Sequence, residues 1–258
     1  MLPEPPPDTV HGMFDNLSDA YEAMVDWPKR LAHEAPFYRR LFETARAKRV
    51  VDVACGTGHH AAMFHNWGLE VEGADLSPEM IERAQTRFGQ PDGLRWVVRG
   101  FQEPIAGAGK GFDIAVCVGN SLALANDLTT IQTAIRQMLA AVHPGGAVVV
   151  QVLNLWRLAE GPCLWQKSLR AKLEPGEVLL LKGIHRCGGQ GQVDMVVIDP
   201  ANGGLLKSES TPFVGLEAEW LEQMADDAGA RKVEIFGGYQ DQPYQRETSV
   251  DLVMIAEK

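Results

Sequence analysis

Short apolar runs alternate with segments of helical periodicity along most of the chain, which predicts an α/β fold around a parallel sheet. Ser77 and Pro78 supply an N-cap and a first-turn proline for one of the expected helices. Strands are expected at residues 49–54, 70–74, 94–99, 112–118, 147–153, 232–236 and 248–256. Helices are expected at residues 58–67, 78–89, 128–142 and 216–228.

The N-terminal part of the chain has a helical pattern over residues 11–46. Apolar residues recur there at three- and four-residue steps, as at Leu17, Tyr21 and Met24. Pro28 marks a helix start after a break, and Pro36 predicts a second break or kink within the following helix.

The pattern changes between residues 154 and 213, where β-rich segments are separated by glycine-containing turns. Strands are expected at residues 178–186, 192–199 and 205–211. Adjacent short strands with tight turns are typical of an antiparallel meander. We interpret it as an insertion into the α/β domain and not as a separate domain.

Composition narrows the functional classes. The chain has 24 Lys and Arg against 34 Asp and Glu, a formal net charge of −10, which argues against a nucleic-acid groove and an anionic membrane surface. No signal peptide is visible, and no apolar run approaches the roughly 18 residues of a membrane span. The four cysteines form no C-x-x-C pair. We therefore expect a cytoplasmic protein with reduced thiols that binds neither nucleic acid nor membrane.

Residues 50–58 comprise most of the first expected strand and the glycine loop that follows it. Such a loop presents backbone N–H groups at the carboxyl end of a parallel strand, where α/β sheets bind ligands. Residues 56–61 satisfy the dinucleotide pattern G-x-G-x-x-G/A, which is weak evidence by itself. Asp52, an acid within the strand, is not required by that pattern and favours a different cofactor.

The motifs at residues 51–58, 74–80, 112–121 and 143–146 resemble those of class I S-adenosylmethionine (SAM) methyltransferases. More narrowly, they resemble the glycine and sarcosine N-methyltransferase group, well over residues 21–152 and hardly at all in the meander. The resemblance implies a Rossmann-like α/β fold: a seven-stranded class I methyltransferase sheet with N-terminal helices and an inserted antiparallel β meander.

The resemblance also implies one SAM-dependent methyltransferase domain over residues 1–258. We expect an N-terminal helical cap, a SAM-binding core, an inserted β-rich acceptor lid, and the last helix and strands of the core. These parts cover residues 1–46, 47–153, 154–214 and 215–258, respectively.

SAM carries an adenosine, a sulfonium cation and an amino-acid tail, so it needs different partners along its length. Ala54 and Gly56 lack bulk and let the cofactor lie against the loop backbone. Asp75 is placed to accept both ribose hydroxyls, although an acid before a helix can also act as a cap. The resemblance implies cofactor contacts from Tyr21, Trp27, Arg30, Asp52, Ala54, Cys55, Gly56, Gly58, Asp75, Leu76, Met80, Gly100, Phe101, Gln102, Val118, Gly119 and Asn120.

Three of these assignments leave alternatives open. Arg30 pairs with the SAM carboxylate or is a solvated surface charge. Asp52 lies near the SAM amino group or holds the loop backbone. Phe101 stacks on adenine or belongs to the core, and the adenine amine is left to Gln102 or Glu103.

A metal site at His59, His60 and His65 is not expected, because His60 and His65 lack helical i, i+4 spacing and no clustered Cys or acid ligands accompany them. Solvated positions or contacts with the cofactor tail are the preferred interpretation of these histidines. The resemblance implies SAM as the cofactor, with S-adenosylhomocysteine as product, and no metal is expected.

Methyl transfer from a sulfonium is an in-line displacement, so the protein mainly aligns acceptor, methyl and sulfur and excludes water. Asn120 is a candidate to orient an amine or hydroxyl acceptor, and His185 is a candidate base for a hydroxyl. Tyr239 and Tyr244 are candidate polar orienters. The expected acceptor is a small molecule methylated on N or O.

One departure from the resembling group concerns the acceptor. Glycine-specific members place an arginine just after strand five, where this chain has Trp156 followed by Arg157. Glycine is a poor candidate unless Arg157 or Arg186 takes over that task.

Two other functions stay open at this stage: a SAM-binding protein without methyl transfer, and an NAD(P)-dependent oxidoreductase using the same glycine loop. The oligomeric state is not encoded in any pattern of this sequence.

Overall fold

The computed structural model describes residues 17–105, 111–125, 127–174 and 176–258. The chain divides into two compact units. The larger unit comprises Trp27–Arg157 and Gly215–Lys258, and the smaller comprises Leu158–Val214 with the N-terminal stretch through Asp26.

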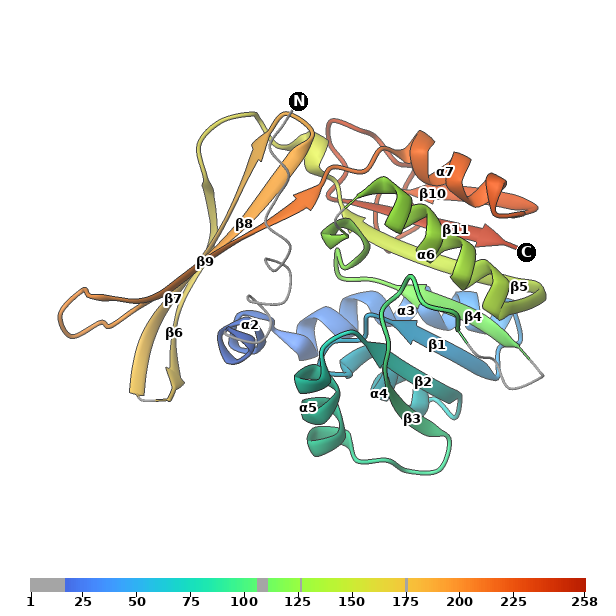
Figure 1. Cartoon of the computed structure of the whole chain (residues 1–258), viewed down its shortest axis with the longest axis horizontal. Helices are drawn as coiled ribbons and strands as arrows, with labels where there is room; N and C mark the ends of the chain where they lie inside the picture. The colour runs from blue at the N-terminus through green and yellow to red at the C-terminus, as the bar shows by residue number, and fades with distance from the viewer. Residues whose placement is uncertain (1–16, 106–110, 126, 175) are drawn as a thin grey trace. The chain divides into compact units, whose positions relative to one another are not determined.

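A seven-stranded sheet forms the centre of the larger unit, as predicted (Figure 1). Strand β11 is antiparallel to both of its neighbours, and the other adjacent pairs are parallel. In spatial order the strands are β10 (Lys232–Phe236), β11 (Asp251–Glu257), β5 (Val142–Leu153), β4 (Phe112–Cys117), β1 (Arg49–Val53), β2 (Glu70–Asp75) and β3 (Leu94–Val98).

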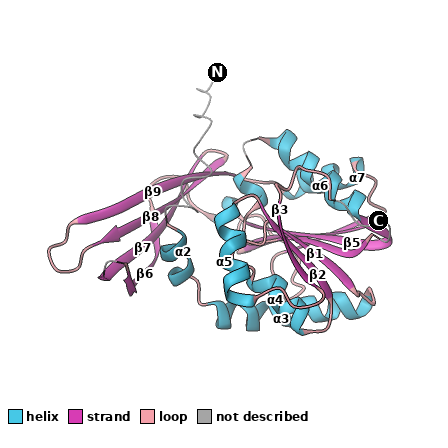
Figure 2. Cartoon of the chain, turned by 60° about the horizontal axis from the view of Figure 1, so that its bottom comes forward, coloured by secondary structure: helices cyan, strands magenta, loops and turns pink. Residues whose placement is uncertain are grey.

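Helices cover both faces of this sheet, which explains why its central strands are almost continuously apolar. Helices α3 (Trp27–Thr44) and α4 (His59–Asn66) lie on one face, and α6 (Leu128–Ala141) and α7 (Ala218–Asp227) lie on the other (Figure 2). Helix α5 (Pro78–Phe88) begins at the predicted N-cap, where the Ser77 side chain accepts a hydrogen bond from the Met80 amide.

The strand order reverses between β1 and β4, since the chain passes from β1 to β2 on one side and later returns to β4 on the other. Loops at the carboxyl ends of such strands diverge and leave room for a ligand. The glycine loop leaves β1 at this switch point.

Two predicted boundaries were wrong. Strand β5 begins at Val142 and includes the Pro-Gly-Gly stretch expected to precede it, because the β4–β5 register shifts and Gly145 adopts a φ of 88°. Helix α3 continues through Pro36 without ending. Phe37 and Phe42, which follow this proline, are buried and hold the helix against the sheet.

The smaller unit contains the predicted antiparallel meander, a four-stranded sheet in the order β6 (Leu164–Leu173), β7 (Gly176–Cys187), β8 (Gln190–Ile198) and β9 (Leu205–Val214). Helix α2 (Ser18–Met24) and the preceding Leu17 contribute to a core with buried side chains of β7 and β8. Strand β6 was not predicted, because apolar and charged residues alternate only over residues 169–173, and its first half carries three polar residues in succession.

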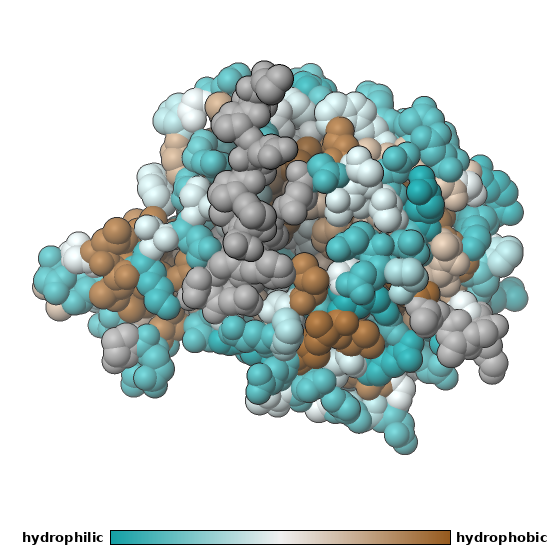
Figure 3. Space-filling model, in the orientation of Figure 1, coloured by the Kyte–Doolittle hydropathy of each residue, from teal (hydrophilic) through white to brown (hydrophobic). Residues whose placement is uncertain are grey.

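Several large apolar side chains of the smaller unit are exposed, and Figure 3 shows brown hydrophobic patches among the teal hydrophilic surface. The exposed apolar side chains of the smaller unit are Leu164, Trp165, Leu205 and Leu206. Among the described residues, no helix is both long and apolar enough to cross a bilayer.

Candidate cofactor and acceptor site

The glycine loop has a left-handed backbone at three positions, with φ values of 63° at Ala54, 54° at Gly56 and 84° at Gly58. A Cβ on Gly58 would lie 2.5 Å from Cη2 of Trp96, so glycine is needed there for close packing of the loop. A Cβ on Gly56 would meet nothing within 4 Å. The backbone at Gly56 therefore faces open space in which a ligand can approach it.

Asp75, at the end of β2, holds this loop through its carboxylate. One oxygen accepts a hydrogen bond from the Gly56 amide at 2.8 Å, and the other accepts one from the Ser77 amide at 3.0 Å. The loop and the carboxylate are thus joined at the sheet edge where the ribose of SAM is expected. The ribose contact itself remains a prediction.

Asp52 is 1% exposed within β1. Burial and, to a smaller extent, the charge of Asp75 raise its pKa from 3.8 to about 8, against the opposing effects of the Ala61 amide and Arg30. The carboxyl is therefore largely protonated near neutral pH. A cationic group such as the SAM ammonium or sulfonium beside it would favour its ionised form.

A buried network joins α3 to the start of α4. Glu34 is 4% exposed and accepts hydrogen bonds from Arg30 Nε at 2.9 Å and from His60 Nε2 at 2.6 Å. Burial alone would raise the pKa of Glu34, but His60 and Arg30 lower it below its ordinary value. Burial lowers the pKa of His60 despite the opposing effect of Glu34, so the ring is a neutral donor. The expectation of a solvated His60 was wrong.

The same network brings Arg30 to the end of β4. A Cβ on Gly119 would lie 3.4 Å from Nη2 of Arg30. The guanidinium lies over the Trp27 ring at 5.2 Å, and that ring stacks on His59 with centroids 4.0 Å apart. The structure thus brings Trp27 and Arg30 together with the carboxyl end of β4.

A second polar chain begins at Gly119 and was not predicted. The Gly119 amide donates to Gln151 Oε1 at 2.7 Å, and Gln151 Nε2 donates to Asp251 Oδ1 at 2.8 Å. Burial raises the pKa of Asp251, whereas the Gln151 hydrogen bond lowers it, as do the charges of Arg30 and Arg157. An acid opening the last strand was the available sequence signal, but its hydrogen-bond partner Gln151 lies 100 residues away.

Asn120 follows Gly119 in a left-handed conformation with φ of 69°. Its side-chain oxygen accepts a hydrogen bond from the Leu153 backbone N–H at 2.9 Å, and the Asn120 backbone N–H donates to the Gln151 carbonyl at 3.3 Å. Asn120 therefore ties the β4 loop to β5. The side-chain amide nitrogen of Asn120 is the group suited to donate a hydrogen bond to a methyl acceptor.

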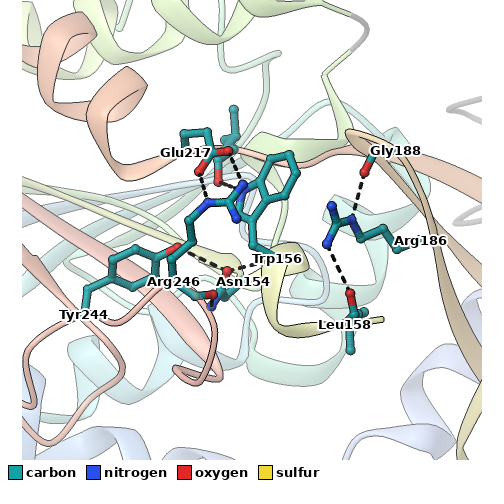
Figure 4. Close-up of polar contacts among 9 residues, drawn as sticks. Asn154, Trp156, Leu158, Arg186, Gly188, Glu217, Tyr244 and Arg246 are labelled. Atoms are coloured by element: carbon teal, nitrogen blue, oxygen red, sulfur yellow. Dashed lines mark hydrogen bonds and ion pairs between the residues drawn. The ribbon is translucent and has the colours of Figure 1, made fainter. Parts of the chain in front are cut away.

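Trp156, at the position where glycine-specific relatives are expected to have arginine, belongs to a polar cluster beyond β5 (Figure 4). Its indole donates to the Leu216 carbonyl at 3.0 Å. Arg246 lies over its ring at 4.2 Å and forms two hydrogen bonds to Glu217, at 3.0 and 2.7 Å. The Arg246 charge is thus neutralised, and Tyr244 donates to Asn154 Oδ1 at 3.1 Å.

Arg157 follows Trp156 in the chain and, unlike Arg246, has a guanidinium nitrogen without a hydrogen-bond partner among the described residues. Its Nε is this nitrogen and is buried. Its charge lowers the pKa of Asp251. This places the guanidinium within electrostatic reach of the polar chain at β5 and β11.

Three candidates belong to the smaller unit. Tyr21 lies on α2, and His185 Nδ1 lies 3.1 Å from Asp194 Oδ2. Arg186 donates to the carbonyls of Leu158 and Gly188 (Figure 4).

Tyr239 is 5% exposed and packs edge-on against Phe37 with ring centroids 5.4 Å apart. Burial raises the pKa of its hydroxyl well above 10. This core position makes Tyr239 a poor partner for an acceptor.

The remaining cofactor candidates differ in accessibility. Phe101 is partly exposed and Gln102 is exposed, whereas Val118 and Met80 are buried and Leu76 is 44% exposed. Burial raises the pKa of Cys55, which makes its thiol a neutral packing group.

Gly100 is held by a local contact, since its amide donates to Glu103 Oε1 at 2.7 Å. Glu103 therefore already has a partner in the turn that follows β3, which leaves the Gln102 amide as the freer of the two candidates for the adenine amine.

Comparison with known proteins identifies methyltransferases, both for the SAM-binding core and for most of the chain. A family model described as a methyltransferase domain matches residues 50–146. The glycine/sarcosine N-methyltransferase of Parasynechococcus marenigrum (strain WH8102) is 25% identical over 242 residues, which cover 88% of this chain and 78% of that protein. The glycine N-methyltransferase of Rattus norvegicus is 30% identical over 163 residues, and the match covers 56% of each protein.

Solved methyltransferase structures match nearly the whole chain. The CcbJ methyltransferase from Streptomyces caelestis has a TM-score of 0.76 at 22% identity, covering 96% of this chain and 98% of that one. SAM-bound CalS10, an amino pentose methyltransferase from Micromonospora echinaspora, has a TM-score of 0.72 at 22% identity, covering 93% and 96%.

These matches decide between the two cofactors that the glycine loop left open, in favour of SAM over a dinucleotide. Residues 50–146 match a methyltransferase domain family, the chain is similar to class I SAM-dependent methyltransferases, and SAM is its cofactor.

Proposed function

We propose that this protein transfers a methyl group from SAM to the nitrogen of a small-molecule amine. The observation that carries the proposal is the polar chain from Gly119 through Gln151 to Asp251, which holds a carboxylate at the carboxyl edge of the sheet. Oδ1 of Asp251 accepts the Gln151 hydrogen bond, and in this proposal Oδ2 accepts one from an ammonium or amine N–H.

In this proposal Asp75 binds the ribose, Arg30 binds the SAM carboxylate, and the cofactor methyl points toward Asn120 and Asp251. An in-line displacement then needs the amine lone pair aligned with the methyl–sulfur bond. Asp251 and Asn120 orient the amine, and its proton leaves before transfer.

An amine fits better than a hydroxyl for a chemical reason. A neutral amine is nucleophilic without further activation, whereas an alcohol or phenol needs a base with a pKa near neutrality. Proteins similar to this chain support the choice of an amine. The sequence relatives named above are N-methyltransferases of glycine or of glycine and sarcosine, and CalS10 is an amino pentose methyltransferase.

The acceptor we favour is a hydroxylated amine and not free glycine. Trp156 replaces the arginine expected in glycine-specific members, and Arg246 is already neutralised by Glu217. Trp156 thus offers a ring in place of a cation, and the Arg246 charge is not free for a substrate carboxylate.

An amino-acid acceptor is the second candidate, and one observation favours it. The buried Arg157 Nε has no partner among the described residues, and a substrate carboxylate would supply one. This candidate predicts that glycine or sarcosine is methylated and that Arg157→Met abolishes the preference for a carboxylate.

The test is a transfer assay with methyl-labelled SAM and acceptors in matched pairs, each an amine and the alcohol of the same skeleton, with an amino sugar, glycine and sarcosine among the amines. Methylated amines with stoichiometric S-adenosylhomocysteine are expected. Methylation of the alcohols alone would overturn N-transfer. SAM binding without turnover on any acceptor would instead favour a SAM-binding protein without methyl transfer.

A further inference from the structure

Three side chains with metal-binding atoms converge on the sheet of the smaller unit. Cys163 precedes β6, His185 lies on β7 and Asp194 lies on β8. Their ligand atoms all lie within 4.8 Å of one another, and all three side chains are partly buried.

The strand register explains this convergence. Gly183 pairs with Trp165 on one side and with Asp194 on the other, and His185 follows two residues later on the same face of β7. Gly183 itself is buried, and any Cβ there would overlap the Cys163 sulfur. The missing side chain at Gly183 is therefore what allows the thiol, imidazole and carboxylate to meet.

The separations match those of a tetrahedral metal site. Cys163 Sγ lies 3.5 Å from Asp194 Oδ2, and His185 Nδ1 lies 3.1 Å from the same oxygen. Ligands at about 2.3 Å (sulfur) and about 2.0–2.1 Å (nitrogen, oxygen) from zinc lie roughly 3.5 Å and 3.3 Å apart at tetrahedral angles.

We propose that Cys163, His185 and Asp194 bind a zinc ion, with water in the fourth position. Thiolate, imidazole and carboxylate are the ligand types that zinc takes in proteins. Zinc binds cysteine as the thiolate, so binding would release the Cys163 proton.

The ion would connect two strands of the four-stranded sheet and the segment that precedes a third. It would link the segment before β6 to β7 and β8, and it would make His185 a ligand and not a general base. Because only the folded sheet assembles the three ligands, zinc would stabilise this unit.

The test is a titration of the reduced, metal-stripped full-length protein with Co²⁺, read by the thiolate-to-cobalt charge-transfer band. One equivalent of Co²⁺ should produce the band, and Zn²⁺ should remove it by displacement. Cys163→Ser should abolish the band, and His185→Gln and Asp194→Asn should each raise the dissociation constant at least about tenfold.

Cys187→Ser is the matched control, since Cys187 is an exposed thiol on the same strand as His185. The control should keep the band with unchanged affinity. Absence of the band in the unaltered protein, its survival in Cys163→Ser or its loss in Cys187→Ser would each overturn the proposal. Unchanged SAM binding and far-ultraviolet circular dichroism of metal-free Cys163→Ser verify that this variant folds.

Discussion

The buried carboxylate of Glu34 accepts a 2.6 Å hydrogen bond from Nε2 of His60, across 26 residues of sequence. This contact joins the middle of α3 to the first turn of α4, immediately after the glycine loop. Since Glu34 also accepts from Arg30 Nε, one carboxylate positions both the loop helix and the arginine proposed for the SAM tail.

Replacing Glu34 should therefore cost both stability and cofactor affinity. Glu34→Ala leaves His60 and Arg30 without their shared acceptor and should lower the free energy of unfolding by about 3 kcal/mol. It should also weaken SAM binding about tenfold, because Arg30 is no longer held beside Gly119. Chemical denaturation and calorimetric titration measure the two effects, with Glu43→Ala on the exposed face of α3 as control. Equal stability of both variants would contradict the assigned role.

The pH dependence of the same pair has a defined sign. The folded pKa values of Glu34 and His60 lie below the ordinary 4.5 and 6.5, respectively, so the unfolded chain binds protons first on acidification. The stability that the pair contributes is present above these values and is lost as pH falls from about 6.5. His60→Gln, which removes the titrating imidazole, should lose less stability than the unaltered protein between pH 7 and pH 4, as measured by urea denaturation. The difference should not exceed about 1.4 kcal/mol per pH unit, the limit for a single titrating group. An equal loss in both proteins would contradict the lowered pKa of His60.

The contribution of Asp52 to stability should depend on pH with the opposite sign. Its folded pKa of about 8 lies above the ordinary 3.8, so its contribution to stability falls as pH rises between these values. Asp52→Asn removes this loss and should be more stable than the unaltered protein at pH 8 in the absence of SAM. The gain should shrink toward pH 4 at up to about 1.4 kcal/mol per pH unit. Urea denaturation across this pH range checks the slope, and a gain independent of pH would contradict a protonated Asp52.

The two loop glycines should respond differently to alanine. Gly58→Ala forces a Cβ against Trp96 at a φ of 84° and should destabilise the fold by about 2–4 kcal/mol. Gly56→Ala meets open space and should cost only about 1 kcal/mol of backbone strain, while weakening SAM binding because the methyl group occupies the cofactor's approach. Thermal denaturation and SAM titration of both variants separate packing from binding. Equal losses of stability would show that the assignment of the two roles is wrong.

Asp251 should affect the acceptor and not the cofactor. Asp251→Asn removes the carboxylate proposed to orient the amine and should lower kcat/KM about 10–100-fold, the value of one charged hydrogen bond. The dissociation constant of SAM should stay within twofold. Glu222→Gln, an exposed substitution on α7, is the control. A parallel loss of SAM affinity would mean that Asp251 supports the cofactor site instead.

The sequence predicted the elements whose signals are local. The strand–glycine-loop–helix unit and the Ser77 cap depend on residues close together in the chain, whereas the seven-stranded sheet was expected from the resemblance to class I methyltransferases. Strand β6 was missed because apolar and charged residues alternate only in its second half.

The polar networks were missed for a different reason. Glu34 and His60 look like residues of two unrelated helices, and Gln151 and Asp251 are separated by 100 positions. Their pairing depends on which strands and helices become neighbours, and no local pattern encodes that. The same limit applies to Cys163, His185 and Asp194, which come together only through the register of three strands.

The central claim is that SAM lies against the glycine loop with its ribose on Asp75, and calorimetric titration with SAM tests it most directly. The unaltered protein should bind SAM with one site per chain and should not bind NAD. Asp75→Ala should raise the SAM dissociation constant about 10–100-fold, because two hydroxyls lose a charged acceptor and the Gly56 amide loses its anchor. Asp92→Ala, at an exposed position before β3, should bind as the unaltered protein does. Unchanged SAM affinity in a folded Asp75→Ala variant would contradict the account.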